Sequence, residues 1–468
     1  MIVPPLVFLV VSFVLWQLAN AIFIPELLAN RLFEILPVSF IEWGVQLMGS
    51  LAKQLAFANV TLIYFGSYFA FAFNWERLRP FFKHSFIGAI SLWGVNVLVL
   101  LPLAGKGVFG YDLPQGPYAA CLLLFVAHWI FARLLHAQAP RSEPMTASSR
   151  RIFVVAIGIA ALALVKRGYD YWFRPDGRVE NGTGIFPSIT GLSKEITPSD
   201  EFYTVSKNSV DPLVMRVDWK LRIDGLVTTP SDFTLDDLRK MQVLSVFATL
   251  ACISNEVGGN WIGNARWTGV PLTSVLKAVG ALKGVRDVVF HASDGYADSI
   301  PIERAIHPFC LLAYEMNDTS LTPAHGFPLR MIVPGIYGMK NVKWITRIEL
   351  RGDDYRGFWQ KRGWDDAAPY KLMSRIDVAR NGVVAGIAFG GDRGVSAVEV
   401  RIGDEPWRQA ELSTALSPLT WVLWHVNADV AGKRIMVRMF DAAGEPQIGQ
   451  PAPPFPSGSS GFHTTVGS

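Results

Sequence analysis

Cysteine is scarce in this chain, which has only three of them in 468 residues: Cys121, Cys252 and Cys310. None stands in a CxxC, CxxCH or paired Cys/His motif, and there is no HExxH motif. This pattern argues against a disulfide framework, an iron–sulfur cluster, c-type haem and a zinc site made only of protein ligands. Cys310, in "HPFCLLAYEM", is flanked by apolar residues, so we expect it to be a small buried side chain.

Charge is also scarce in the first third of the chain. Four apolar stretches without any charged residue precede residue 166, and they run over residues 2–24, 54–75, 85–105 and 113–132. Each is long enough to span a bilayer. A fifth stretch, "IFVVAIGIAALALV" at 152–165, is shorter and rich in Ala and Gly. The sequence therefore predicts an N-terminal α-helical membrane domain of about five spans over residues 1–167.

Lys and Arg are concentrated in two of the loops between these stretches. The loop after the second stretch carries Arg77, Arg79 and Lys83, and the loop before the fifth carries Arg133, Arg141, Arg150 and Arg151. Because such loops are retained on the cytoplasmic side, we expect them and the N-terminus to lie inside the cell. The chain beyond Val165 would then face the periplasm from a bacterial inner membrane.

The segment "SSRRIFVV", with Arg150 and Arg151, is similar to a twin-arginine export signal, which carries folded proteins across the membrane. The stretch that follows is less hydrophobic than the first four, as such signals tend to be. The alternative to this interpretation is that Arg150 and Arg151 are only positive-inside anchors.

The remainder of the chain has a balanced charge and no basic cluster, which argues against a nucleic-acid partner. Over residues 168–370, short β-type runs alternate with helical segments, which predicts an α+β domain. One such helix begins in "TLDDLRKM", where Thr234 is the expected N-cap. Residues 371–468 alternate with period two and predict an all-β sandwich, and the Pro-rich, Gly-rich end at 449–461 is expected to be a surface tail.

Cys252 ends an apolar strand in "FATLACISNEVGG", directly before a polar, Gly-rich loop. A nucleophilic cysteine needs a base, and no His is placed beside it by the sequence. The remaining chemical role is that of one soft thiolate on a metal whose other ligands come from a cofactor. Downstream, His325, Arg330 and Lys343 offer donors for a phosphate and a polar heterocycle. A lone Arg after "FPL" is equally typical of a solvated or salt-bridged surface group.

Eight motifs in family order give the chain a resemblance to the sulfite oxidase family of molybdenum-pterin enzymes. They are "EFYTVSKN", "WKLRIDGLV", "ACISN", "NARWTGVPL", "ASDGY", "LLAYEMND", "HGFPLRMIVPG" and "NVKW", between about residues 200 and 447. The resemblance implies that Cys252 ligates molybdenum beside the dithiolene of one molybdopterin, and that the C-terminal sandwich is immunoglobulin-like. It implies that the pterin and its phosphate are bound by Asn208, Asp294, His325, Arg330, Asn341, Val342 and Lys343.

The substrate is less clear, because this family includes sulfite oxidases and a periplasmic reductase of protein methionine sulfoxide. Sulfite oxidases hold their dianion with arginines, where this chain has Lys207 and Val257, and Ser209 replaces an expected His. Lys keeps the charge but loses the bidentate fork, so we expect weaker oxyanion affinity and a preference for S- or N-oxide reduction. Lys207 and Tyr355 are the further catalytic candidates, although Tyr355 is equally interpreted as a surface tyrosine.

We expect electrons to come from an external carrier, either a cytochrome or a quinone-linked membrane protein, and a homodimer is compatible with the sequence. His84, His128 and His136, in or beside the apolar stretches, could serve a haem b or quinone site, but interfacial or helix-packing histidines are the more ordinary interpretation. The other class of function is a cofactor-free binding or scaffolding module on a membrane anchor. Retention of Cys252, His325, Arg330 and Lys343 favours the enzyme.

Overall fold

The computed structural model describes residues 2–19, 21–37, 40–41, 44, 51–82, 84–110, 117–137, 186, 189–208 and 210–468. The chain divides into two compact units. The first comprises residues 1–176 with 206–210, and the second comprises 177–205 with 211–468. The predicted boundary near residue 370 falls inside the second unit. The fifth apolar stretch, with Arg150 and Arg151, lies outside the described residues.

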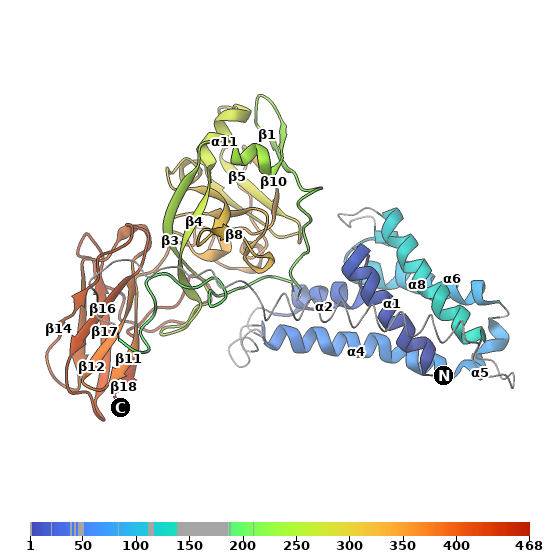
Figure 1. The fold of residues 1–468 in the computed structure, drawn as a ribbon, viewed down its shortest axis with the longest axis horizontal. Coiled ribbons are helices and arrows are strands. Elements are labelled where there is room, and N and C mark those ends of the chain that lie inside the picture. The colour runs from blue at the N-terminus through green and yellow to red at the C-terminus, as the bar shows by residue number, and fades with distance from the viewer. Residues whose placement is uncertain are drawn as a thin grey trace. The chain divides into compact units, whose positions relative to one another are not determined.

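The described part of the first unit is helical (Figure 1). Helix α8 packs against α1 and α6, and α4 packs against α1 and α2. Their shared core contains Phe8, Tyr68, Trp75, Phe131 and Leu135. The helices are α1 (Val3–Ala19), α2 (Ile24–Ile35), α4 (Leu51–Phe73), α5 (Trp75–Leu78), α6 (Ser85–Val95), α7 (Leu101–Leu103) and α8 (Pro117–Ala137), with a π-helical turn η2 (Asn96–Leu100) and 3-10 turns η1 (Arg79–Phe81) and η3 (Val108–Gly110).

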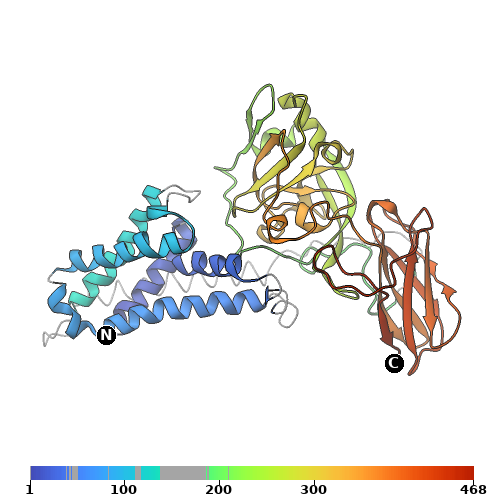
Figure 2. The ribbon, with the colours of Figure 1, turned by 180° about the vertical axis from the view of Figure 1, so that it is seen from behind.

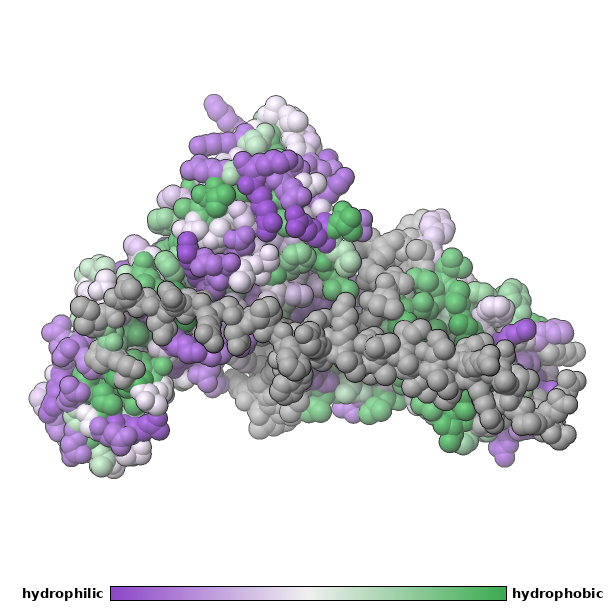
Figure 3. Space-filling model, in the orientation of Figure 1, coloured by the Kyte–Doolittle hydropathy of each residue, from purple (hydrophilic) through white to green (hydrophobic). Residues whose placement is uncertain are grey.

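Two described helical segments, Ala52–Phe73 and Ser85–Leu103, are long and apolar enough to cross a membrane. The apolar helices Val3–Trp16 and Cys121–Ala137 are shorter. Large apolar side chains point outward from this unit, and Figure 3 shows hydrophobic residues over much of its described surface. Leu62, Ile63, Leu103 and Leu122 have exposed fractions between 61% and 74%.

A polar cluster is buried among α4, η2 and α8. The His128 ring is fully buried, and its Nδ1 lies 2.7 Å from the Leu124 carbonyl oxygen, so Nδ1 carries the donated proton. Its Nε2 then accepts from the Tyr68 hydroxyl at 2.8 Å or from the Asn96 amide at 3.0 Å. Tyr64 donates to the Asn96 Oδ1 at 2.8 Å. Both His128 nitrogens thus make hydrogen bonds between or within the helices. This agrees with a helix-packing role, which the sequence allowed beside a haem or quinone site.

The first part of the second unit contains two sheets. One has the strand order β2-β1-β10-β5-β6, in which only β1 and β10 are parallel; the other has the order β3-β4-β7-β8, with β9 also paired to β7. Their strands are β1 (Leu221–Gly225), β2 (Ser231–Phe233), β3 (Leu244–Ala251), β4 (Ile262–Pro271), β5 (Asp287–Ala292), β6 (Ala297–Pro301), β7 (Leu311–Met316), β8 (Thr319–Ser320), β9 (Arg330–Ile332) and β10 (Ile345–Arg351).

Short helices cover the first sheet. The buried face of α11 (Leu272–Val279) places Leu272, Val275, Leu276 and Val279 in the same core as Ile223 and Ile348. Helix α10 (Leu235–Arg239) begins as predicted, because Thr234 and Asp237 form a reciprocal capping box. The remaining turns are α12 (Ile302–Ala305), η4 (Pro323–His325), η5 (Gly338–Lys340) and η6 (Gln360–Arg362). The prediction of an α+β domain is confirmed for this region.

The C-terminal part consists of two four-stranded antiparallel sheets, in the orders β11-β12-β16-β15 and β14-β13-β17-β18 (Figure 2). Both sheets contribute to one core, for example Ile376 and Trp424 from the first and Val400 and Val437 from the second. The strands are β11 (Met373–Arg380), β12 (Val383–Phe389), β13 (Ala397–Ile402), β14 (Arg408–Gln409), β15 (Glu411–Leu412), β16 (Val422–Asn427), β17 (Arg434–Phe440) and β18 (Thr464–Val466), with the turn η7 (Gly391–Arg393).

Segment 449–461 lies largely at the surface, as expected, since residues 449–453, 455 and 456 are exposed, but it is not a free tail. Gln447 donates to the Gly461 carbonyl at 2.8 Å, and Ser459 donates to the Asn255 carbonyl at 2.7 Å. The Phe455 ring packs edge-on against Trp364 with 5.2 Å between centroids. A composition rich in Pro, Gly and Ser indicates an irregular backbone near the surface, but it does not reveal the contacts that tie this segment to the rest of the unit.

Candidate metal and cofactor site

Cys252 lies directly after β3, as predicted, and its exposed fraction is 9%. Its N–H donates to the Trp261 carbonyl at 2.9 Å, and its carbonyl accepts from the Asn255 N–H at 3.1 Å. These bonds fix both ends of the following loop. Within the described ranges, no group of three or more His, Cys, Asp or Glu side chains is placed to hold a metal ion. A single soft thiolate at this strand end is suited to act as one protein ligand beside ligands from a cofactor.

Cys252 interacts electrostatically with four buried tyrosines: Tyr203, Tyr296, Tyr337 and Tyr370. Burial raises the pKa of each phenol, and negative charge on Cys252 raises it further; for Tyr337 the pKa reaches about 12. These side chains therefore stay protonated at neutral pH and can donate hydrogen bonds. Tyr370 also accepts from the Ala251 N–H at 3.2 Å, one residue before the cysteine.

The structure brings His325, Arg330 and Lys343 together around Gly326. Gly326 has a φ of +105°, and a Cβ there would lie 3.0 Å from the Lys343 Cβ and 3.2 Å from the Arg330 Cβ. Only glycine permits this backbone and this close approach. His325 Nε2 donates to the Ser199 carbonyl at 2.6 Å, and Lys343 Nζ donates to the Ala324 carbonyl at 3.0 Å. The predicted convergence of these three cationic or polar side chains is observed.

Arg330 is a buried cation, with an exposed fraction of 6%. Its guanidinium lies 4.8 Å from the centre of the Trp267 ring and donates to the His325 carbonyl at 3.1 Å. Its Nε is buried and has no hydrogen-bond partner among the described residues. Burial lowers the pKa of Arg330 to about 10, so it stays charged at neutral pH. A buried guanidinium with an unused donor is suited to an anionic group such as a phosphate. The alternative of a solvated surface arginine is wrong.

The cysteine and the arginine occupy one region of the unit. Charge on Cys252 raises the pKa of Tyr203 and of Tyr370, and charge on Arg330 lowers the pKa of the same two groups. The two phenols thus lie within electrostatic range of both. This arrangement fits a cofactor that is ligated at one end by a thiolate and held at the other by cationic groups.

Other predicted cofactor residues take local structural roles. The Asn341 side chain is buried, accepts from the Val333 N–H at 2.7 Å and donates to the Tyr337 carbonyl at 3.2 Å. Val342 is part of the core under the first sheet, and its carbonyl accepts from the Met331 N–H. Asp294 accepts from the Tyr296 N–H at 2.9 Å in the turn before β6. Cofactor contacts by these residues stay predictions.

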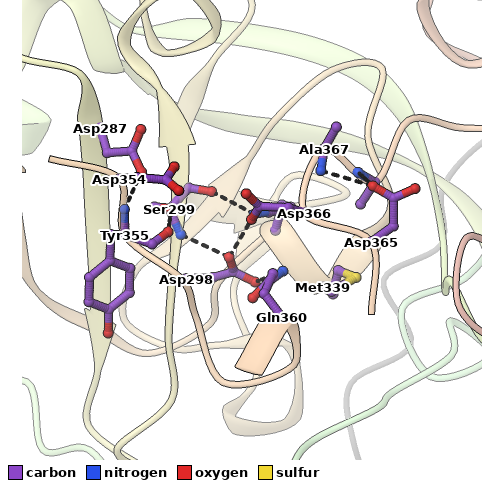
Figure 4. Close-up of polar contacts among 12 residues, drawn as sticks. Asp287, Asp298, Ser299, Met339, Asp354, Tyr355, Gln360, Asp365, Asp366 and Ala367 are labelled. Atoms are coloured by element: carbon purple, nitrogen blue, oxygen red, sulfur yellow. Dashed lines mark hydrogen bonds and ion pairs between the residues drawn. The ribbon is translucent and has the colours of Figure 1, made fainter. Parts of the chain in front are cut away.

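Tyr355 has a different environment from the four tyrosines above. Its ring lies 6.2 Å from that of His291 on β5, and cationic groups of Arg351 and Lys361 lie 5.7 Å and 5.2 Å from its centre. Figure 4 shows the ring directed away from Asp298, Gln360 and Met339. Cys252 is not among the groups that shift the pKa of Tyr355, and a catalytic role for Tyr355 stays a prediction.

Lys207 and Asn208 fall in segment 206–210, which belongs to the first unit and not to the unit that contains Cys252. Lys207 Nζ donates to Asn208 Oδ1 at 2.7 Å. The structure thus leaves their predicted roles in catalysis and pterin binding as predictions.

The loop after Cys252 is tied to the C-terminal part of the unit. Arg375 donates to the Gly259 carbonyl at 2.9 Å and pairs with Asp377 at 2.6 Å. At Gly258, with a φ of +79°, a Cβ would lie 2.4 Å from the His463 ring. Residues 253–261 contain no Lys or Arg, and Val257 is 37% exposed. This loop supplies no cationic side chain for an oxyanion.

The sequence reasoning missed the tyrosines. Tyr203 and Tyr296 lie in the motifs "EFYTVSKN" and "ASDGY", and Tyr337 lies between "HGFPLRMIVPG" and "NVKW". Their position in or beside these motifs was the available signal. Nothing in the sequence around Tyr370 distinguished it.

Comparison with known proteins defines the class. Residues 208–359 match the family model described as the oxidoreductase molybdopterin binding domain. The chain belongs to the sulfite oxidase family of molybdopterin-dependent oxidoreductases, which implies a molybdenum-molybdopterin cofactor.

Individual relatives agree with this assignment. The mitochondrial sulfite oxidase of Drosophila melanogaster is 30% identical over 221 residues, which cover 42% of this chain and 38% of the relative. The sulfite oxidase of Arabidopsis thaliana is 28% identical over 331 residues, which cover 56% of this chain and 84% of the relative. The crystal structure of the sulfane dehydrogenase SoxCD from Paracoccus pantotrophus shares the fold, with 21% identity and a TM-score of 0.52 over 61% of this chain and 86% of that one.

Proposed function

We propose that this protein is a membrane-anchored molybdenum oxidoreductase that catalyses two-electron oxygen-atom transfer with an external electron carrier. The observation that supports this most directly is the placement of Cys252 and the buried Arg330 in one tyrosine-lined region. A scaffolding module would gain nothing from a buried guanidinium with an unused donor, because burying charge is costly.

The residues fit the cofactor. Cys252 would ligate the metal, and Arg330, Lys343 and His325 would hold the phosphate end of molybdopterin. The bound cofactor supplies the two-electron redox chemistry and the position at which oxygen is transferred. The protonated phenols of Tyr203 and Tyr370 would orient polar groups and exclude water between these two ends.

We further propose that the substrate is an S- or N-oxide. Reduction of such a substrate consumes two electrons and two protons and releases the deoxygenated product and water. The loop at 253–261 has no cation for a dianion, and Lys207 lacks the bidentate geometry of an arginine. Sulfite-type oxidation is the second candidate, and the similarity of the chain to two sulfite oxidases supports it.

Metal analysis and a substrate panel test this proposal. We expect about one molybdenum per chain in full-length protein expressed in a host that makes the cofactor. With a reduced viologen as electron donor for S-oxide reduction and an oxidised one-electron acceptor for sulfite oxidation, kcat/KM for the S-oxide should exceed that for sulfite at least about tenfold, because the oxyanion clamp is incomplete. Absence of molybdenum would refute the enzyme, whereas efficient sulfite oxidation would refute only the substrate.

We also propose that the helical unit spans the inner membrane and that the catalytic unit folds in the cytoplasm before it is exported to the periplasm. The apolar helices and their outward hydrophobic side chains support the anchor. The sequence "SSRRIFVV" supports export in the folded state. The immunoglobulin-like assignment of the C-terminal sandwich is likewise proposed from the resemblance.

Conservative replacement of the arginine pair tests the export route. Arg150→Lys with Arg151→Lys keeps every charge, so positive-inside anchoring should be unchanged. We expect the catalytic unit of the double variant to stay in the cytoplasm. External protease should then digest the catalytic unit in wild-type spheroplasts and leave it intact in spheroplasts of the variant. Equal digestion would mean that charge alone sets the topology. Arg77→Lys with Arg79→Lys is the matched control and should behave as wild type.

A further inference from the structure

A buried ion pair lies beside Tyr296, one of the four tyrosines grouped with Cys252 above, and has no role assigned so far. Lys340 has an exposed fraction of 3%, and Asp298 is fully buried. Lys340 Nζ lies 2.9 Å from Asp298 Oδ1 and donates to the Ser299 carbonyl at 3.0 Å. Its third contact is the partly exposed Asp366, at 3.4 Å. Figure 4 shows the cluster around Asp298.

All acceptor positions of Asp298 are used. The Ser299 N–H donates to its Oδ1 at 2.8 Å, and Tyr296 and Gln360 donate to its Oδ2 at 2.9 Å and 3.2 Å. The Tyr296 hydroxyl is also 2.8 Å from the Met339 carbonyl. Burying an ion pair is rarely the most stable solution, since apolar residues of similar volume are often as stable. A fully bonded pair in this place therefore calls for a reason other than stability.

The reason lies in what the pair connects. Lys340 ends η5, whose three residues lie between the edge strand β6 of the first sheet and the edge strand β3 of the second. Lys340 reaches β6 through Asp298 and Ser299. At the other end of the turn, a Cβ on Gly338 would lie 3.2 Å from the Ala251 carbonyl and 2.7 Å from the Tyr203 hydroxyl. Ala251 is the residue directly before Cys252.

We propose that Asp298 and Lys340 are positioning residues of the candidate metal site. Their ion pair sets the position of η5 between the two edge strands, and through it the position of the strand end that carries Cys252. This inference rests on the proposed function, and it explains why a buried charged pair occurs beside the strand end and the tyrosines.

Three variants of the full-length protein test the role. Asp298→Asn keeps the shape and removes the charge, Lys340→Met removes the other charge, and Asp298→Leu with Lys340→Met replaces the pair by apolar side chains. We expect each single variant to lower the thermal midpoint and the double variant to recover it to within about 2 °C. Despite that recovery, kcat in the double variant should stay at least about tenfold below wild type, with KM changed less than threefold.

Two readouts separate positioning from stability. The electron paramagnetic resonance spectrum of the dithionite-reduced metal should change in the double variant, and the Cys252 and Asn255 amides should exchange with deuterium at least about tenfold faster. Lys194→Met with Glu201→Leu, which removes an exposed ion pair of 2.7 Å, is the control and should change neither. If the double variant has the wild-type spectrum, kcat and exchange rates, the pair is only structural and the inference is wrong.

The outcome is separable from that of the proposed function. Wild-type protein without molybdenum would refute the proposed function, but the exchange rates still test the coupling of the ion pair to the strand end. If the double variant does not fold, the Asp298→Asn variant tests the inference instead. Amide exchange rates and a paramagnetic resonance spectrum equal to those of wild type in that variant would overturn the inference.

Discussion

Replacing Cys252 by serine is expected to reduce turnover at least about 100-fold while the fold persists. The hydroxyl is a harder and weaker donor than the thiolate, and it occupies less volume at a position whose backbone is fixed by bonds to Trp261 and Asn255. Losses of 10-fold to 100-fold are common even for residues that only support a metal ligand, so loss of the ligand itself should cost at least as much. The measurements are kcat and molybdenum per chain.

Cys310 provides the matched control. It is fully buried, and its thiol donates to the Arg304 carbonyl at 3.1 Å, a bond that a serine hydroxyl can also make. Cys310→Ser should therefore lower the free energy of unfolding slightly and leave kcat within about twofold. Cys252→Ser with wild-type turnover would show that Cys252 is not the catalytic ligand. A loss of similar size in both variants would indicate a general effect of removing a buried thiol.

Much of the second unit was predictable because its signals are local. The capping box of Thr234 involves only neighbouring residues, so it does not depend on where the helix packs. The strands of the C-terminal sandwich likewise follow from the alternation of apolar residues. The proximity of His325 and Arg330 was also predictable, because they lie five residues apart around the Gly-Phe-Pro turn, whereas Lys343 comes from a later segment. Gly326 then allows the side chains to approach.

Contacts between segments distant in sequence were not predictable in this way. Tyr370 reaches the Ala251 N–H across 119 residues, and Lys340 reaches Asp298 across 42. From the sequence alone, Tyr370 cannot be distinguished from an ordinary buried tyrosine, and Lys340 cannot be distinguished from a surface lysine. Their partners become neighbours only when the sheets are assembled. The contacts of segment 449–461 were missed for the same reason, because the partners of Ser459 and Phe455 lie elsewhere in the unit.

Arg330→Met should have opposite effects on the cofactor-free and the cofactor-bound protein. In cofactor-free protein the buried guanidinium is unfavourable, because burial lowers its pKa in the folded state to about 10 from 12.5. A base with a lowered folded-state pKa reduces stability at every pH at which it is charged, including neutral pH. Met removes that charge at similar length, so the thermal midpoint of protein from a cofactor-deficient host should rise by at least about 2 °C.

In the cofactor-bound protein the same substitution removes the partner of an anionic phosphate. Loss of one partner from a buried charged pair commonly weakens binding about 100-fold or more, so molybdenum per chain should fall steeply in a cofactor-producing host. The stabilisation that bound ligand gives to the folded state should disappear with it. Arg239→Met is the control: Arg239 also lies over an aromatic ring, 5.1 Å from the centre of Tyr314, but has the Glu315 carboxylate 3.7 Å away. That variant should keep its molybdenum and lose a little stability in both hosts. If Arg330→Met destabilised cofactor-free protein and kept full molybdenum, the guanidinium would be a structural cation and the phosphate would be bound elsewhere.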